Sequence, residues 1–163
     1  ILVSTDQRVI AVRAPDGAYW LSSTRTERAT GAAWAQRAAA PLGPAWPREG
    51  EGAGGALRCD AEGCIYRARG RVVALERDAA ALAEDCPRAD LVVSPAAARR
   101  RCRGPAVIDR IDTWREGGQA IWLDPGAIRI RSVRAWQGER PWVPRRGSTH
   151  DLARRDDSGR GDQ

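Results

Sequence analysis

Residues 89–102 read ADLVVSPAAARRRC, and this stretch decides how the chain is interpreted. Leu91, Val92 and Val93 form a short apolar run of the kind that fills a β-sheet covered on both faces. In open α/β folds the chemistry usually lies just beyond the carboxyl ends of such strands. Here that position holds a Ser-Pro pair, three alanines, three arginines and a cysteine. Three possibilities follow: a catalytic site, a nucleic-acid contact, or the remnant of a site.

The basic composition of the chain has two interpretations. A formal net charge of +6 favours an acidic partner such as nucleic acid or anionic lipid. All 27 basic residues are arginines, however, and they are interleaved with 21 acids, as codon usage in a GC-rich genome would also produce. A mildly basic solvated surface and a polyanion-binding face are both compatible with this pattern, and arginine can bind phosphate in a bidentate way.

The length of 163 residues allows one sizeable core rather than two. We expect residues 1–144 to form a single domain, with residues 41–55 as a surface loop rich in Pro and Gly and residues 145–163 as a disordered tail. The chain starts inside an apolar run and contains no Met, so we also expect it to be a piece of a longer protein. No stretch approaches the roughly 18 uncharged apolar residues that a membrane helix needs.

Apolar periodicity predicts a mixed β-sheet with few helices, and hence an α+β or α/β fold. The first 23 residues read as three short strands joined by turns, and the Ala-rich segment 26–40 reads as a helix. Asp78 stands in the N-cap position of a second Ala-rich helix, which Pro87 terminates. Further strands are expected at residues 71–75, 89–93, 105–108, 119–123 and 128–133.

Seven tryptophans occur in a chain that has no Phe. We expect Trp20, Trp122 and Trp114 in the core. Trp136 and Trp142 flank the segment GERP, and two interpretations of them stay open. They pack against the sheet, or they form a platform on which single-stranded bases stack, which requires exposed aromatic side chains beside basic groups.

The four cysteines form two natural pairs. Cys59 and Cys64 flank a tight turn, in which Gly63 suits the left-handed position, and residues that flank such a turn face each other at disulfide distance. Cys86 and Cys102 lie on either side of the strand quoted above. Free buried thiols and a zinc site are the alternatives, although the spacing lacks the C-x2-C pairs of zinc sites. Two disulfides would indicate an oxidising compartment.

Histidine-dependent catalysis is excluded for the predicted domain, because the only histidine, His150, lies in the predicted tail. Gly-rich phosphate loops of the Walker or dinucleotide type are also missing. Two carboxylates, Asp109 and Asp112, follow a buried strand three residues apart and could hold a divalent cation. The alternative is that they cap a turn and pair with nearby arginines.

Three segments, in this order and spacing, carry a resemblance to a known family: RVVALERDAAALAEDCPRADLVVS (residues 71–94), CRGPAVIDRIDTWREGGQAIWLD (102–124) and GERPWVP (138–144). They resemble the C-terminal soluble region of the ComEC family of DNA-internalisation competence proteins, most closely the alphaproteobacterial forms. Many members of that family carry here a metallo-β-lactamase-like domain, regarded as a nuclease that acts on the non-transported strand.

The resemblance also implies which metal ligands this chain lacks. In those nucleases one strand is followed by a Gly-Asp ligand, and the next strand ends in His-His-Gly-Ser. Matched by order, residues 75–78 stand at the first position and residues 94–97 where the histidines would be. Only Asp78 could still be a ligand, and the H-x-H-x-D-H run of the superfamily has no counterpart. The resemblance therefore implies a shortened, metal-free metallo-β-lactamase-like sandwich without a cofactor.

From the resemblance we expect a non-catalytic accessory domain of a membrane DNA-uptake channel, at the periplasmic face of the inner membrane. It would bind or position incoming single- or double-stranded DNA, or brace the membrane-embedded channel region of its parent chain. The expected phosphate contacts are Arg99, Arg100, Arg101 and Arg103. A metal-dependent nuclease that uses Asp78, Asp109 and Asp112 is the enzymatic alternative, and a vestigial structural domain is the third possibility.

Overall fold

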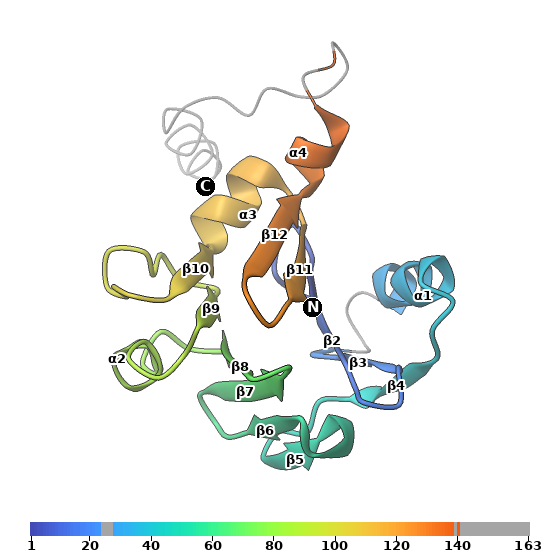
Figure 1. The fold of residues 1–163 in the computed structure, drawn as a ribbon, viewed down its shortest axis with the longest axis horizontal. Coiled ribbons are helices and arrows are strands. Elements are labelled where there is room, and N and C mark those ends of the chain that lie inside the picture. The colour runs from blue at the N-terminus through green and yellow to red at the C-terminus, as the bar shows by residue number, and fades with distance from the viewer. Residues whose placement is uncertain (24–27, 139, 141–163) are drawn as a thin grey trace, which may run out of the picture.

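The computed structural model describes residues 1–23, 28–138 and 140. In this part of the chain, four α-helices and a short 3-10 helix surround two six-stranded sheets (Figure 1). Sheet A has the strand order β12-β11-β1-β2-β3-β4, and sheet B the order β10-β9-β8-β7-β6-β5. Both sheets contain parallel and antiparallel pairs. The expected α+β class with mixed sheets and few helices is confirmed.

The strands of sheet A are β12 (Ile128–Ser132), β11 (Gln119–Leu123), β1 (Leu2–Val3), β2 (Ile10–Arg13), β3 (Tyr19–Leu21) and β4 (Leu42–Ala45). Those of sheet B are β10 (Ala106–Asp109), β9 (Leu91–Ser94), β8 (Arg71–Glu76), β7 (Gly63–Ala68), β6 (Leu57–Cys59) and β5 (Gly50–Gly52). The helices are α1 (Arg28–Arg37), α2 (Leu82–Asp85), α3 (Arg110–Glu116) and α4 (Val133–Gln137), and the 3-10 helix is Ala53–Gly55.

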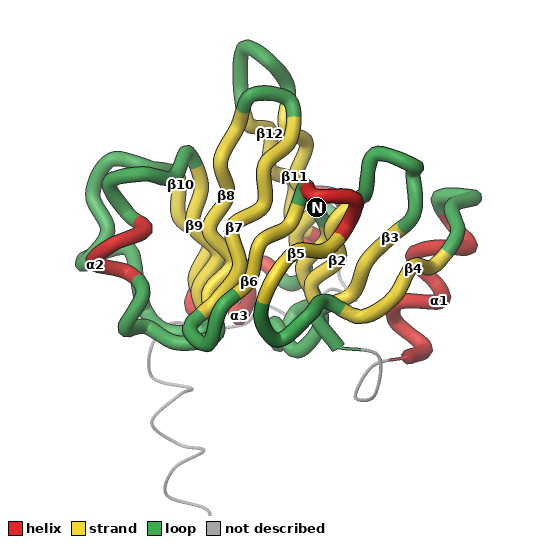
Figure 2. The backbone as a smooth tube through the Cα atoms, turned by 90° about the horizontal axis from the view of Figure 1, so that it is seen from below, coloured by secondary structure: helices red, strands yellow, loops and turns green. Residues whose placement is uncertain are grey.

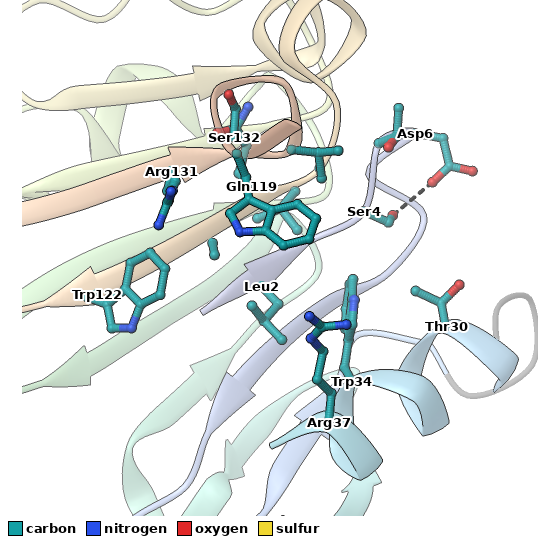
Figure 3. A pocket seen from close by; sticks show the side chains of 16 residues that line it. Leu2, Ser4, Asp6, Thr30, Trp34, Arg37, Gln119, Trp122, Arg131 and Ser132 are labelled. Carbon is teal, nitrogen blue, oxygen red and sulfur yellow. Dashed lines mark hydrogen bonds between the residues drawn. The ribbon is translucent and has the colours of Figure 1, made fainter. Parts of the chain in front are cut away.

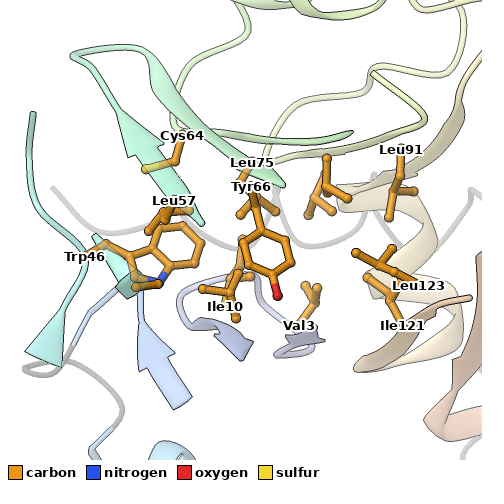
Figure 4. Packing of buried hydrophobic residues seen from close by; sticks show 14 of the residues in the cluster. Val3, Ile10, Trp46, Leu57, Cys64, Tyr66, Leu75, Leu91, Ile121 and Leu123 are labelled. Carbon is orange, nitrogen blue, oxygen red and sulfur yellow. The ribbon is translucent and has the colours of Figure 1, made fainter. Parts of the chain in front are cut away.

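The two sheets pack face to face and share one apolar core (Figure 4). Leu75 from sheet B lies in this core together with Ile10 and Ile121 from sheet A. The hydroxyl of Tyr66 donates a 2.7 Å hydrogen bond to the backbone carbonyl of Arg13 and so links the sheets by a polar contact as well. Alternation along each strand sends every second side chain into this layer, which makes the fold a sandwich.

Strand β9 is buried on both faces, as its continuous apolar run predicted. Leu91 and Val93 face the core between the sheets, whereas Val92 belongs to a second cluster on the outer face of sheet B. Helix α2 and a loop tied by the Cys86–Cys102 disulfide cover this outer face. The predicted Cys59–Cys64 and Cys86–Cys102 pairings are both confirmed, so the zinc and free-thiol alternatives are wrong.

Helix α1 covers part of the outer face of sheet A. Figure 2 shows α1 and α2 on opposite sides of the sandwich. The contact is close at Gly31, where a Cβ atom would lie 2.4 Å from a methyl carbon of Leu21. Trp34 packs beside it against Val9 and Ala11. Among the described residues, α1 covers only part of this face, and Trp136 of α4 approaches another part of it, beside Leu2 and Trp122.

Residues 41–55 are not the surface loop that their Pro and Gly content predicted. Strands β4 and β5 and the 3-10 helix form within this stretch. Both strands lie at sheet edges, where a proline costs no ladder hydrogen bond. Trp46 is buried between them in the core, and its indole N–H donates to the carbonyl of Trp20 at 2.9 Å. This buried aromatic side chain holds the segment in place.

The structure also corrects the expected roles of other tryptophans. Trp122 was expected in the core but is 44% exposed, because it alternates with the core residues Ile121 and Leu123 and so faces outward. Trp136 is 60% exposed, so it does not lie in the core. Trp142, His150 and the expected tail 145–163 lie outside the described residues.

The N-terminal strand-turn-strand pattern and the strands expected between residues 71 and 133 are confirmed to within a few residues. The helix expected at 26–40 is observed as Arg28–Arg37, with residues 26 and 27 outside the described part. Among the helices that the structure describes, none has the length and apolar character needed to cross a membrane.

The turn between β6 and β7 is not formed by a left-handed glycine, as was expected. Gly63 has ordinary strand geometry rather than a left-handed backbone. The turn is built instead by Asp60, whose carboxylate accepts hydrogen bonds from the backbone N–H groups of Glu62 and Gly63 at 2.9 Å each. Glycine is required for another reason: a Cβ atom at residue 63 would lie 2.9 Å from the carbonyl oxygen of Leu75.

We therefore expect Gly63→Ala to lower the free energy of unfolding by about 1–3 kcal/mol, because backbone of β8 must move away. Chemical denaturation measures this change. Gly126→Ala is the matched control, since no heavy atom lies within 4 Å of a Cβ there and its stability should be nearly that of the wild type. Equal midpoints for both variants would contradict the close-approach explanation.

Candidate functional site

Three buried polar side chains lie in a row at the carboxyl ends of the parallel strands of sheet B. Glu76 ends β8, Ser94 ends β9 and Asp109 ends β10. The strand register pairs Asp109 with Ser94, and Leu75 with Val93 one residue earlier. This strand-end row is the position at which α/β folds place their chemistry. It lies on the sheet face that α2 and the disulfide loop cover.

Glu76 is an unusual member of this row, because it is only 5% exposed and neither carboxylate oxygen has a hydrogen-bond partner among the described residues. The pKa of Glu76 is raised to about 7, mainly by burial and partly by the nearby carboxylates of Asp85 and Asp78, whereas the Ser94 hydroxyl and Arg101 oppose the rise. Ser94 is close enough to influence this pKa without reaching good hydrogen-bond geometry. At neutral pH the carboxyl group is therefore held near its titration midpoint.

Asp109, in contrast, has hydrogen-bond donors at both carboxylate oxygens. Its carboxylate accepts four backbone hydrogen bonds, from Ala98 (3.0 Å), Arg99 (3.3 Å), Ile111 (2.9 Å) and Asp112 (3.2 Å). Burial alone would raise the pKa of Asp109, but these N–H groups outweigh that effect and lower it. The same carboxylate thus caps α3 and anchors the loop that follows β9.

The other two acids that could have bound a cation also have structural roles. Asp112 completes the capping box of α3 and forms a 2.8 Å ion pair with Arg99. Asp78 is exposed and accepts a hydrogen bond from the N–H of Ala80, in a turn that precedes α2. It is not the N-cap of that helix, a position that Ala81 occupies. The cap interpretation is correct for Asp109 and Asp112 and wrong in detail for Asp78.

The strand-end row does not fit the pair of metal ions that a metallo-β-lactamase-like nuclease requires. Such a site needs about five to seven N or O ligands in one cleft. Here the row offers one unpartnered carboxyl, one serine and one aspartate whose oxygens already accept four N–H groups. Among the residues that the structure describes, no group of three His, Cys, Asp or Glu side chains is arranged to hold a metal ion.

The four predicted arginines lie on the loop between β9 and β10, and they are not equivalent. Arg99 is held by Asp112 and by the carbonyl of Val107. Arg101 donates a 3.3 Å hydrogen bond to the carbonyl of Ala79. Within the described part of the chain, the exposed Arg100 and Arg103 have no side-chain partner. The backbone of this loop is held at Ala98 by a hydrogen bond to Asp109 and at Cys102 by the disulfide to Cys86.

A second polar and aromatic surface, which we call the tryptophan groove, lies on the outer face of sheet A. It has a volume of about 700 Å³. In Figure 3, Trp34 and Arg37 project from α1 on one side, Trp122 and Arg131 lie on the other side, and Leu2 lies between them. Trp136 of α4 completes the lining.

Sequence reasoning missed most of this groove. It considered Trp136 as a stacking residue but placed Trp122 in the core, and it did not single out Arg37 or Arg131 at all. Strict alternation from Ile121 would have placed Trp122 outward. No local sequence pattern could have predicted that α1, β11 and α4 lie side by side, because only the packing of sheet A brings them together.

Comparison with known proteins identified no matching family model, no similar curated protein and no similar solved structure.

The isolated carboxyl group of Glu76 predicts a stability that depends on pH. Its folded pKa of about 7 lies above the ordinary value of 4.5, so the folded state binds the proton more tightly. Below about pH 4.5 Glu76 is protonated in both the folded and the unfolded state, so it does not change the free energy of unfolding. As the pH rises from there through 7, the unfolded state loses the proton first, and the free energy of unfolding falls. We expect Glu76→Gln to be more stable than the wild type at pH 8 by on the order of 2 kcal/mol, with the difference vanishing near pH 4.5.

Denaturation midpoints at a series of pH values measure this difference. Glu62→Gln is the control, because it makes the same chemical change at an exposed position. A Glu76→Gln variant that is less stable at pH 8 than at pH 5, relative to the wild type, would contradict the assignment.

Proposed function

We propose that this chain is a non-catalytic accessory domain of a membrane DNA-uptake channel, and that it binds or positions incoming DNA at the periplasmic face of the inner membrane. The ordered resemblance of residues 71–94, 102–124 and 138–144 to the soluble region of ComEC proteins is the first support. The α+β sandwich is compatible with a shortened metallo-β-lactamase-like domain. The two disulfides are compatible with an oxidising compartment.

The observation that carries the DNA-binding proposal is the rigid basic loop that follows β9. Its backbone is fixed at Ala98 and Arg99 by two N–H bonds to Asp109, and at Cys102 by the disulfide to Cys86. Arg100 and Arg103 extend from this loop as exposed cations. A fixed backbone reduces the entropy that binding would otherwise lose, and guanidinium groups bind phosphate in a bidentate way. Such contacts recognise the DNA backbone without regard to base sequence.

The chemistry of the strand-end row supports a non-catalytic role. Both oxygens of Asp109 are occupied by backbone N–H groups, and Asp112 is paired with Arg99, so neither carboxylate is arranged to activate water. Glu76 is enclosed under α2 and the loop, and a substrate phosphate would have to displace them to reach it. These features favour binding over cleavage.

Arg100→Ala/Arg103→Ala should weaken binding to a DNA duplex and reduce the steepness of its salt dependence. Loss of two phosphate contacts is expected to lower the slope of log K against log salt by about 2. Fluorescence anisotropy with a labelled duplex at several salt concentrations measures both quantities. Arg99→Ala should have a smaller effect on the slope, since its charge is already paired with Asp112.

The charge-matched control is Arg48→Ala/Arg58→Ala. Both arginines are exposed, and they lie at the β5–β6 edge of sheet B, opposite the β9–β10 edge. If this control and the Arg100→Ala/Arg103→Ala variant gave the same affinity and the same slope, the loop would not be the contact surface.

A further inference from the structure

The tryptophan groove exposes aromatic surface that the fold itself does not use. Trp122 is 44% and Trp136 60% exposed, although indoles are the largest apolar side chains and usually find cover. They come from β11 and α4, and no other described residue buries these two side chains. A concentration of exposed aromatic side chains in a concave surface marks an interaction site rather than a packing accident.

Each exposed indole has a guanidinium stacked over it. The Arg37 guanidinium carbon lies 5.9 Å from the centre of the Trp136 ring, so this contact spans from α1 to α4. The guanidinium carbon of Arg129 lies 5.5 Å from the centre of the Trp122 ring. Both distances are within the range of a cation–π interaction. These contacts orient the indole planes and place positive charge beside them.

The charge of the groove is positive after its internal pairs are removed. Asp6, the acid in the lining, is compensated by Arg8 at 3.3 Å and by the hydroxyl of Ser4 at 2.8 Å. Arg129 is paired with Asp124. Arg37 and Arg131 then carry the net charge of the rim, and neither forms an ion pair within the described part of the chain.

We infer that the tryptophan groove binds single-stranded nucleic acid, with bases stacked on Trp122 and Trp136 and phosphates bound by Arg37 and Arg131. The indoles need bases with a free π-face and the arginines need phosphates, and a single strand offers both. The bases of a duplex stack on one another and cannot reach the indoles. The floor formed by Leu2 and neighbouring small residues is apolar and lies on strands β1 and β11. This inference rests on the proposed DNA-binding function and assigns the strand specificity to a second surface.

The groove and the basic loop thus have different tasks. The loop carries exposed cations without aromatic side chains and is suited to backbone phosphates of any DNA. The groove, on the other sheet, adds base stacking, which only an unpaired strand permits. A domain with both surfaces would bind a single strand more tightly than a duplex of the same length.

The experiment uses the whole chain, a twelve-residue oligothymidylate and a duplex of the same length. Binding of the oligonucleotide should quench the fluorescence of the exposed tryptophans. Trp122→Leu and Trp136→Leu keep an apolar side chain but lose the aromatic face, and each should weaken single-strand binding about ten- to a hundredfold. Trp136→Phe keeps an aromatic face and should therefore bind the single strand more tightly than Trp136→Leu does. Duplex affinity should stay unchanged in all three variants.

Arg37→Ala/Arg131→Ala should weaken oligothymidylate binding and reduce its salt slope by about 1.4, the value for two contacts to a single strand. The control for charge is again Arg48→Ala/Arg58→Ala, which should behave as the wild type does. Circular dichroism checks that the variants are folded. Their substituted side chains are on the surface, so we expect intact spectra.

If the wild type binds oligothymidylate and the Trp122→Leu and Trp136→Leu variants bind it with the same affinity, this inference is overturned and the proposed function stands. Absence of binding to both the oligonucleotide and the duplex would overturn both. Quenching by vesicles of equal parts phosphatidylglycerol and phosphatidylcholine, with none by oligothymidylate, would assign the groove to a lipid surface and so also overturn the inference.

Discussion

The double burial of β9 is the constraint on which the rest of the structure depends. Leu91 and Val93 must be covered on one side and Val92 on the other. Sheet A supplies the first cover, and α2 with the disulfide loop supplies the second. Because a strand with three fully buried apolar residues cannot lie at an exposed edge, β8 and β10 flank it on both sides.

This central position explains the polar row at the strand ends. Glu76, Ser94 and Asp109 follow directly from three adjacent parallel strands, so they lie side by side and are enclosed by the same cover. In such an enclosed place each polar group needs a partner. Asp109 has four, whereas Glu76 has none among the described residues and shifts its pKa instead. The row therefore stabilises one helix and one loop, and it leaves one carboxyl that titrates near neutral pH.

The two outer faces of the sandwich are covered unequally, and this difference separates the two candidate surfaces. Helix α2 and the disulfide loop cover the outer face of sheet B over β8, β9 and β10, so this loop offers only surface arginines such as Arg100 and Arg103. Sheet A has α1 over one part and the tryptophan groove over another. The exposed indoles of Trp122 and Trp136 are tolerated there, because arginines stack on them.

The sequence by itself predicted the fold class and most of the strands, and it favoured both cysteine pairings and a capping role for Asp109 and Asp112 over metal binding. These features depend on local pattern: apolar runs, turn residues and short spacings. It did not predict the buried Trp46, the close approach that requires Gly63, or the isolation of Glu76. Each of these depends on what another segment places opposite the residue. Residues 41–55, for example, form strands because β3 and β6 provide the edges.

The basic loop after β9 could be located from the sequence, but only the tertiary structure decided where the tryptophan groove lies. Arg37, Trp122 and Trp136 are up to 99 residues apart and meet because sheet A and its helices pack together. The charge and the number of tryptophans were visible in the composition, but their arrangement was not. Side chains that converge from distant segments leave no periodic signal in the chain, since their proximity is fixed by long-range packing and not by local conformation.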